Sequence, residues 1–375
     1  MMKIFIALFL SVIAAQTFAQ FEVKINVSVP SLKHVEDSVY IAGSFNGWNP
    51  SSAQRLSLNS SGQGAGILYL DKGNYDYKFT RGSWEKSETN ASGTGLANRK
   101  LTVNFDTVFN VVIDGWQDDF SSASQQRKST ASKHVMIMDT GFFMQQLGRT
   151  RRIWLYLPEG YNTSSEKYPV LYMHDGQNLF DNATSAYGEW GLDEFLDSLK
   201  SSQQYIVVGI DNGLAKRMNE YNPYAFADFG KGEGDAYVDF IVNTLKPYID
   251  QRYRTKVDKK NTSIAGSSMG GLISLYAVLK YPKTFGSAGI FSPAFWTASG
   301  IDNGAFKNSK AVRSKLFFYA GGKESEKMIP DMRRIETLIR KHSPSKIKEV
   351  IDVNAQHNED AWQKHFPAFY HWIAE

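Results

Sequence analysis

The first third of the chain alternates between apolar and polar positions with a period of two residues. The stretch FEVKINVSV at 21–29 has the pattern of a half-buried β-strand. No helical period appears in this part of the chain. The pattern therefore predicts an all-β sandwich of roughly a hundred residues over 20–116. Further short strands, separated by Gly, Asn, Ser and Asp, are expected at 39–45, 64–70, 75–79, 100–103 and 107–113.

The pattern changes from about residue 135 onward, where near-continuous apolar strands alternate with helical stretches such as 234–253 and 330–342. This alternation is typical of a mostly parallel sheet with helices on both faces, and it predicts one such domain over 135–375. Residues 117–134 have little apolar content and many Ser and Gln, as expected of a linker. The predicted strands of the second domain are 151–157, 169–175, 205–211, 261–267, 287–292, 315–321 and 349–355.

The N-terminal residues 1–19 have the features of a secretory signal peptide. A basic residue, Lys3, precedes an apolar run, and small residues end it near a cleavage point between Ala19 and Gln20. The alternative is a membrane anchor, for which the run is short. We therefore expect an exported protein, periplasmic or secreted, that has no membrane association once the peptide is removed.

The amino-acid composition excludes several kinds of partner and of catalytic group. A hydrophobic content of 42% and a charged content of 21% describe an ordinary globular protein. The formal net charge is +4 without a block of Lys and Arg, which argues against nucleic acid as a partner. Cysteine is absent, so disulfides, thiolate metal sites and a thiol nucleophile are excluded. A nucleophile would have to be Ser, Thr or a carboxylate.

The motif G-x-S-x-G occurs at 266–270 and centres on Ser268. A predicted strand precedes it and a predicted helix follows it, as in the nucleophile elbow of α/β hydrolases. The flanking glycines relieve crowding in this sharp turn, and the helix N-terminus favours negative charge beside the serine. The alternative is a Ser/Gly helix entry without chemistry. The combination of strand, elbow and helix favours a nucleophilic serine.

A serine hydroxyl needs a histidine base that is held by a carboxylate, and in α/β hydrolases the order along the chain is Ser, acid, His. His357 directly follows the last predicted strand, at the sheet edge where ligands gather, and is the expected base. Glu324 follows strand 315–321 and two glycines, and is the expected acid, with Glu326 as the alternative. The histidines that follow Ser268 are His342, His357, His365 and His371.

Two backbone N–H groups should hold the oxyanion. The N–H of Met269, directly after the nucleophile, is one candidate. The other is the N–H of Gln177, because Gly176 allows that backbone to approach closely. His174 and Asp175 could be imagined as metal ligands, but no third ligand stands at a suitable spacing. We therefore expect them to brace the loop, and we expect no metal and no cofactor.

Five motifs of the second predicted domain are YPVLYMHDGQNLFD, RMNEYNPY, GSSMGG, AGGKE and HNEDAW. Together they resemble the putative-esterase (esterase D-like) family of α/β hydrolases over about 135–375. The family includes acetylxylan esterases, feruloyl esterases and enterobactin-type siderophore esterases. The resemblance implies an α/β-hydrolase fold with Ser268 as nucleophile and His357 as base. It implies Glu324 as acid, where many members carry Asp.

The resemblance also implies that Arg217 and Glu220, in RMNEYNPY, border the substrate pocket. The residues by themselves would indicate a polar loop.

The segments VYIAGSFNGWNP and YDYKFTRGSWE resemble the immunoglobulin-like modules that bind glycogen and starch. The resemblance implies sugar binding by Trp48, Lys78, Trp84 and Asn98. Indole faces stack on pyranose rings, while Lys and Asn bond the hydroxyls. The alternative is a non-binding appendage in which the tryptophans belong to the core.

Together these features predict an exported serine carboxylesterase that removes acetyl or feruloyl groups from plant polysaccharide or oligosaccharides. One alternative is an enterobactin-type siderophore lactone esterase, which a basic pocket rather than an aromatic cleft would favour. The other is a non-catalytic carbohydrate-binding protein on a hydrolase scaffold.

Overall fold

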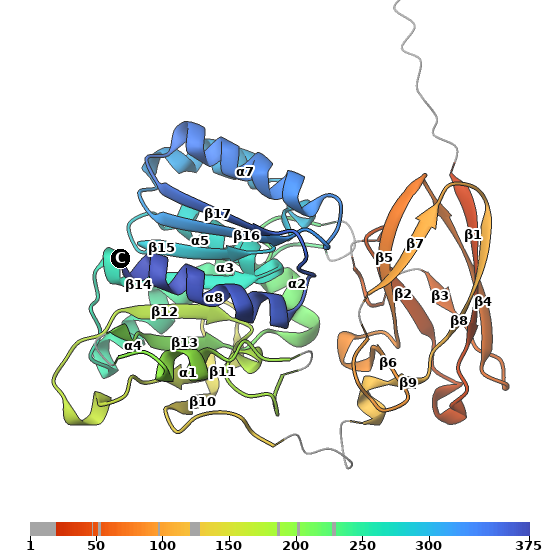
Figure 1. Cartoon of the computed structure of the whole chain (residues 1–375), viewed down its shortest axis with the longest axis horizontal. Coiled ribbons are helices and arrows are strands. Elements are labelled where there is room, and N and C mark those ends of the chain that lie inside the picture. The colour runs from red at the N-terminus through yellow and green to blue at the C-terminus, as the bar shows by residue number, and fades with distance from the viewer. Residues whose placement is uncertain are drawn as a thin grey trace, which may run out of the picture.

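The computed structural model describes residues 20–46, 48–51, 54–96, 98–120, 128–185, 188–200, 203–226 and 230–375. The predicted signal peptide, residues 1–19, lies outside the described residues, as does the part of the predicted linker at 121–127. Within the described residues the chain forms an all-β unit followed by a larger α/β unit (Figure 1). No helix of the described residues is long and apolar enough to cross a membrane.

The all-β unit is built from two main sheets. One sheet has the order β4-β1-β8, with β4 at Gln63–Leu70, β1 at Phe21–Ser28 and β8 at Thr107–Val112. The other has the order β3-β2-β5-β7, with β3 at Arg55–Leu56, β2 at Val39–Gly43, β5 at Gly73–Thr80 and β7 at Arg99–Val103. Short strands β6 (Glu88–Thr89) and β9 (Gly115–Trp116) pair beside them.

The two sheets share one apolar core. Alternate residues of β1 and β5 enter it, including Val23, Ile25, Tyr77 and Phe79. This is the period of two that the sequence shows, because successive side chains on a strand point to opposite faces. The even-numbered residues of β5, such as Lys78, therefore lie on the outer face of the β3-β2-β5-β7 sheet.

The α/β unit is organised around a mixed sheet that, within the described residues, has eight strands in the order β10-β11-β13-β12-β14-β15-β16-β17. The first two strands are antiparallel to their neighbours, and the strands from β13 to β17 pair in parallel. The bounds are β10 Val135–Met144, β11 Arg149–Tyr156, β12 Val170–His174, β13 Ile206–Ile210, β14 Thr262–Ser267, β15 Ser287–Phe291, β16 Lys315–Gly321 and β17 Lys346–Asp352.

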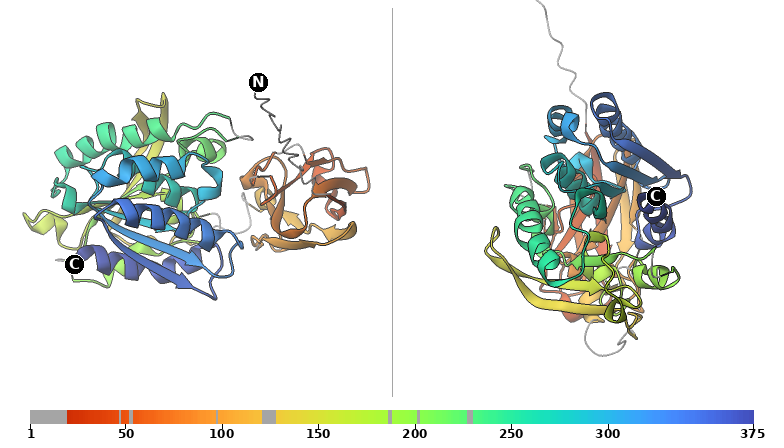
Figure 2. Two further views of the ribbon diagram at one scale, coloured as in Figure 1. Left: turned by 90° about the horizontal axis from the view of Figure 1, so that it is seen from above. Right: turned by 90° about the vertical axis from the view of Figure 1, so that its left-hand side faces the viewer.

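Helices cover both faces of this sheet (Figure 2). One face packs on α3, α4, α5, α6 and α7, and the other on α1 and α8. The near-continuous apolar strands follow from this arrangement, because both faces of each parallel strand are buried. The bounds are α1 Leu192–Asp197, α2 Arg217–Glu220, α3 Gly234–Phe240, α4 Lys246–Arg252, α5 Met269–Lys280, α6 Ile301–Asn308, α7 Met328–His342 and α8 Glu359–Ala374, with a π-helical segment Ile241–Leu245 between α3 and α4.

Candidate active site

Ser268 lies at the carboxyl end of β14, between that strand and α5. Its backbone has φ 57° and ψ −118°, a conformation that L-residues rarely adopt. The N–H of Ser268 donates to the carbonyl of Phe291 at 2.9 Å, and its own carbonyl accepts from the N–H of Ala294 at 3.0 Å. The end of β15 and the segment that follows it therefore hold the strained turn on both sides. The side chain remains half-buried rather than enclosed.

The glycines of the elbow allow close packing around this turn. A Cβ added at Gly266 would come within 3.0 Å of the His174 ring, and one at Gly271 within 2.8 Å of the Phe291 carbonyl oxygen. Real Cβ atoms essentially never come as close as the 2.8 Å at Gly271, and the backbone atom there cannot move aside, so glycine is needed at position 271, directly after the motif. The motif thus reflects the approach of β12 and β15 to the start of α5.

Ser292 directly follows β15, and no motif in the sequence points to it. The residue is fully buried with φ 43°. Its hydroxyl donates to Glu324 Oε1 at 2.7 Å and accepts from the indole N–H of Trp362 at 2.9 Å. The signal that could have found it is its place directly after a buried parallel strand that neighbours the elbow strand.

Glu324 and His357 form a hydrogen-bonded pair at the same edge of the sheet. Nδ1 of His357 lies 2.7 Å from Oε2 of Glu324, whose other oxygen accepts from the N–H of Gly321 at 2.6 Å. The Glu324 side chain is 1% exposed, whereas the His357 ring is 29% exposed. The ring packs edge-on against Trp362. A buried carboxylate thus orients a histidine that solvent can reach.

The choice between the two glutamates of this loop follows from their positions. Glu326 is exposed and accepts a hydrogen bond from the Asn74 amide at 2.6 Å, so it does not face His357. In the described part of the chain, no hydrogen bond joins the Ser268 hydroxyl to His357 in this conformation. Such contacts are often long in the absence of substrate and tighten when it binds.

The segment after β12 lies against the start of α5. Asp175 has φ 57°, and a Cβ at Gly270 would sit 3.5 Å from its carboxylate, which shows how close the two segments are. A short 3₁₀ turn follows at Gly176–Asn178 and carries Gln177. The N–H of Met269 is the first of α5, and N–H groups at such a position have no partner within the helix. The fold thus brings both predicted oxyanion donors to the edge that carries Ser268.

Arg217 lies beside this segment. Its guanidinium donates to both carboxylate oxygens of Asp175, at 2.7 and 2.9 Å, and remains 25% exposed. Burial opposes the ionisation of Asp175, but the charge and hydrogen bonds of Arg217 prevail and lower the pKa of that carboxyl. Arg217 therefore fixes the loop that carries Gln177 and still reaches solvent near it.

Glu220 departs from the expectation that it borders the pocket. Its carboxylate is fully buried and accepts hydrogen bonds from Arg149 at 3.0 Å and from Arg151 at 2.6 and 2.8 Å. Burial raises its pKa, while Arg151 and then Arg149 act in the opposite direction. Glu220 thus ties α2 to β11 and is inaccessible to a substrate.

His174 is fully buried between Tyr221 and Tyr237, and its Nδ1 lies 2.9 Å from the Tyr237 hydroxyl. Burial lowers the pKa of His174 to about 3, so the ring is neutral. With Asp175 it braces the elbow and the segment after β12. Among the described residues, no group of three or more His, Asp and Glu side chains could hold a metal ion.

Glu359 is a further buried carboxylate at this edge, and the sequence reasoning missed it. It is the first residue of α8, after Asn358, whose side chain caps the helix. Its Oε1 accepts a hydrogen bond from Asn178 at 3.4 Å. Burial raises the pKa of Glu359 to about 7. The acidic residue in HNEDAW was the available signal.

The residues predicted to bind sugar are divided between two environments. Trp48 and Trp84 are half-buried and come together, with ring centroids 6.3 Å apart. Asn98 is exposed. Lys78 departs from the expectation of an open binding residue, because it is only 6% exposed, and this burial lowers its pKa.

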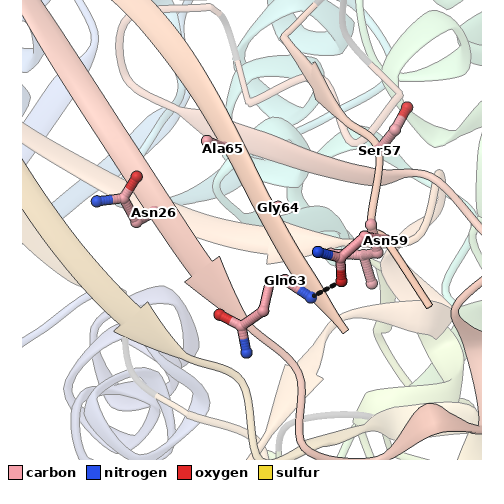
Figure 3. A pocket seen from close by; sticks show the side chains of 7 residues that line it. Asn26, Ser57, Asn59, Gln63, Gly64 and Ala65 are labelled. Carbon is pink, nitrogen blue, oxygen red and sulfur yellow. Dashed lines mark hydrogen bonds between the residues drawn. The ribbon is translucent and has the colours of Figure 1, made fainter. Parts of the chain in front are cut away.

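A shallow hollow lies on the all-β unit beside β1 and β4 (Figure 3). Its lining is polar and apolar in equal measure, and the Gln63 N–H donates to the Asn59 side chain there at 2.9 Å. None of the residues at the carboxyl edge of the large sheet contributes to it. The lining residues are Asn26, Ser57, Leu58, Asn59, Gln63, Gly64 and Ala65.

The arrangement is that of an α/β-hydrolase fold: a mixed, mostly parallel sheet with helices on both faces, a strained turn at Ser268 and a Glu324–His357 pair at one edge of the sheet. A family model described as putative esterase matches residues 144–373. Because this range covers more than half of the chain, the chain belongs to the putative esterase family, and it is a carboxylic-ester hydrolase.

Individual relatives support this assignment. The uncharacterized protein YbbA of Bacillus subtilis (strain 168) is 30% identical over 220 residues, covering 56% of this chain and 80% of that protein. The endo-1,4-beta-xylanase/feruloyl esterase of Xylanibacter ruminicola is 28% identical over 327 residues, covering 82% of this chain but 41% of that larger protein. The enterochelin esterase of Shigella flexneri superposes with a TM-score of 0.51 at 13% identity, covering 95% of this chain and 93% of its own, which shows a shared fold.

Proposed function

We propose that the chain hydrolyses esters through Ser268, His357 and Glu324. The observation that carries the proposal is the 2.7 Å bond between His357 Nδ1 and the buried Glu324 carboxylate, on the edge where Ser268 is held in a strained turn. With Nδ1–H donated to Glu324, Nε2 of His357 is the basic nitrogen. It can therefore accept the serine proton.

The reaction would take two steps. Ser268 Oγ attacks the ester carbonyl carbon, and its proton passes to His357. The N–H groups of Met269 and Gln177 then hold the oxyanion. Collapse of the tetrahedral intermediate expels the alcohol, which takes the proton from His357, and leaves an acyl-serine. Water, activated by His357 in the same way, releases the acid and restores Ser268.

We propose an acyl ester of a plant polysaccharide or oligosaccharide as substrate, with an acetyl or feruloyl group. The relative from Xylanibacter ruminicola supports a feruloyl group, because its name joins a xylanase with a feruloyl esterase. A half-buried aromatic pair also supports it. Phe226 and Trp296 meet edge to face at 6.1 Å, and Trp296 lies two residues after Ala294, which bonds the Ser268 carbonyl. Such rings suit a planar acyl group. Cleavage of the predicted signal peptide would place this activity outside the cytoplasm.

The test is hydrolysis of 4-nitrophenyl acetate and methyl ferulate by the full chain and its variants. We expect Ser268→Ala and His357→Gln to lower kcat/KM by at least about a thousandfold. His365→Gln is the matched control, because His365 also follows Ser268 but binds Asp352 at 2.9 Å, and it should keep activity within threefold.

The outcomes separate the alternatives. A wild type that is folded but inactive on both esters, and active on a cyclic catecholate lactone, would assign the chain to the siderophore esterases. A folded wild type that hydrolyses none of the three esters would favour a carbohydrate-binding protein. Full activity in Ser268→Ala would overturn the proposed nucleophile.

A further inference from the structure

Asn212 contacts the segment Asp175–Gln177, which follows β12 and carries the proposed donor N–H of Gln177; we call it the oxyanion segment. Asn212 itself lies two residues after β13, the strand beside β12. Its side-chain Nδ2 donates to Oδ1 of Asp175 at 2.8 Å, and its backbone N–H donates to Oε1 of Gln177 at 3.2 Å. Asn212 is therefore bonded to the residues at both ends of the oxyanion segment.

The oxyanion segment has a strained and tightly packed backbone. Asp175 has φ 57°, and a Cβ added at Gly176 would come within 2.8 Å of the carbonyl carbon of Gly209. The N–H of Asp175 donates to the Tyr221 hydroxyl at 3.2 Å. A strained backbone of this kind persists only where surrounding contacts determine it. The direction of the Gln177 N–H therefore depends on contacts that come from outside the segment.

A buried ion pair fixes Asn212 in turn. The carbonyl of Asn212 accepts a hydrogen bond from the Arg151 guanidinium, which also bonds both carboxylate oxygens of Glu220, at 2.6 and 2.8 Å. A Cβ added at Gly213 would lie 2.4 Å from Oε2 of the same Glu220 carboxylate. Oδ1 of Asn212 accepts from the N–H of Leu214 at 2.9 Å, which sets the direction of the amide. Side chains locked in this way hold a site in a defined geometry.

We propose that Asn212 is a positioning residue of the esterase site, which holds Asp175 and Gln177 so that the Gln177 N–H is aimed at the oxyanion before the substrate reacts. This inference rests on the proposed function and deepens it. A donor that is aimed in advance stabilises the oxyanion without any reorganisation during the reaction. Such a donor acts in the transition state more than in the bound ester, so the loss of Asn212 should lower kcat and leave KM unchanged.

The experiment measures kcat and KM for 4-nitrophenyl acetate, and the Kd of phenylboronic acid, in the full chain. The boron accepts Ser268 Oγ and becomes tetrahedral, so that one boron-bound oxygen takes the place of the oxyanion. Asn212→Leu removes the amide and keeps a branched side chain. We expect kcat to fall about ten- to hundredfold, KM to stay within about twofold and the Kd of phenylboronic acid to rise at least about tenfold.

The matched control is Asn261→Leu. Asn261 directly precedes β14, at the sheet edge opposite Ser268, and its Nδ2 donates to Asp258 at 2.7 Å. The control therefore removes an amide–carboxylate bond of the same kind and should keep kcat and the Kd within about twofold. Asn212→Asp keeps an acceptor for the Leu214 N–H but loses the donor to Asp175, and its kcat should fall at least as far as that of Asn212→Leu. If Asn212→Leu proves unstable by thermal unfolding, Asn212→Ala is compared with Asn261→Ala in its place.

Any of three results would overturn the inference. The first is a kcat of Asn212→Leu within twofold of the wild type, which includes a loss confined to Asn212→Asp, since that loss would report the added charge. The second is a fall in kcat with an unchanged Kd for phenylboronic acid, because Asn212 would then act elsewhere than on the oxyanion. The third is turnover that persists in Ser268→Ala, which would overturn the proposed function as well. This third result is distinguishable from the others because it needs no Asn212 variant.

Discussion

Replacing Ser292 by alanine tests the network that holds the Glu324–His357 pair. The substitution deletes one hydroxyl and leaves the side chains of the proposed triad, Ser268, His357 and Glu324, intact. Oε1 of Glu324 would lose the 2.7 Å bond from Ser292 and keep the Gly321 N–H, while the Trp362 indole N–H would lose its acceptor inside the protein.

The expected loss of stability follows from those two contacts. A hydrogen bond to a charged group contributes about 1.5–3 kcal/mol, and a buried donor left without a partner costs about 1–3 kcal/mol. Because one hydroxyl makes both contacts, the two values are not additive, and we expect about 3 kcal/mol. In a domain of this size that corresponds to a fall in Tm of roughly 6–12 °C.

The activity should also fall. If about 1.4 kcal/mol of the lost bond is expressed in the transition state, through a less firmly oriented Glu324, kcat/KM drops about tenfold. The assay is hydrolysis of 4-nitrophenyl acetate, paired with thermal unfolding. Ser314→Ala is the control, since its buried hydroxyl donates to the Phe285 carbonyl at 2.8 Å, at the opposite end of β16. It should lose about 1 kcal/mol and no activity.

Glycine at position 292 separates backbone strain from the hydrogen bonds. At φ 43°, glycine is preferred to alanine by about 1 kcal/mol, so Ser292→Gly should be more stable than Ser292→Ala yet no more active. The reasoning would be refuted by a Ser292→Ala enzyme whose kcat/KM stays within twofold of the wild type. Ser292 would then contribute packing alone.

Three further predictions concern the same edge and the rest of the domain. Glu324→Gln should lower kcat about ten-thousandfold, by analogy with the loss of a triad acid. The control Glu326→Gln should keep kcat within twofold of the wild type. Equal losses of kcat in the two variants would reopen the choice between the two glutamates. Gly321→Ala should reduce both Tm and activity, because a Cβ there would lie 2.4 Å from the Ala355 carbonyl oxygen; an unchanged Tm would contradict this packing. Burial raises the pKa of Asp193 from 3.8 to about 7, so the folded state binds this proton more tightly than the unfolded chain. Its contribution to stability is present below pH about 4 and is lost as the pH rises through 7. Urea unfolding should therefore show a fall of up to about 4 kcal/mol between pH 4 and 8 that is absent in Asp193→Asn, and parallel pH profiles would exclude the effect.

Local patterns were sufficient to predict a mostly parallel sheet and the elbow, but the antiparallel edge strand β10 (Val135–Met144) was not among the predicted strands. The G-x-S-x-G motif, its strand and its helix are contiguous, so Ser268 could be placed at a strand end without knowledge of distant contacts. His357 and Glu324 could be proposed because each follows a strand, and parallel strands bring their carboxyl ends to one edge. The choice between Glu324 and Glu326 stayed open, since a loop has no period that fixes side-chain direction.

The misplaced residues depend on contacts across long separations. Glu220 was expected at the pocket, but Arg149 and Arg151 of β11 enclose it, and a pattern within RMNEYNPY carries no information about that strand. The alternation of inward and outward side chains along β5 places Lys78 on the outer face of the β3-β2-β5-β7 sheet. Which face the second unit covers is determined by the docking of two units, and no sequence period reports it.

Three residues at the proposed site have strained backbone conformations. In the described part of the chain, Asp175, Ser268 and Ser292 are non-glycine residues with positive φ, and each directly follows one of the adjacent strands β12, β14 and β15. A strained conformation of this kind costs on the order of 1–3 kcal/mol and persists only where surrounding contacts determine it. Here those contacts differ in kind: Arg217 holds the side chain of Asp175, backbone bonds hold Ser268, and Glu324 with Trp362 holds the hydroxyl of Ser292. The departures from local preference thus coincide with the residues that set the geometry of the nucleophile, the oxyanion segment and the acid, which is where a functional edge is expected to override local rules.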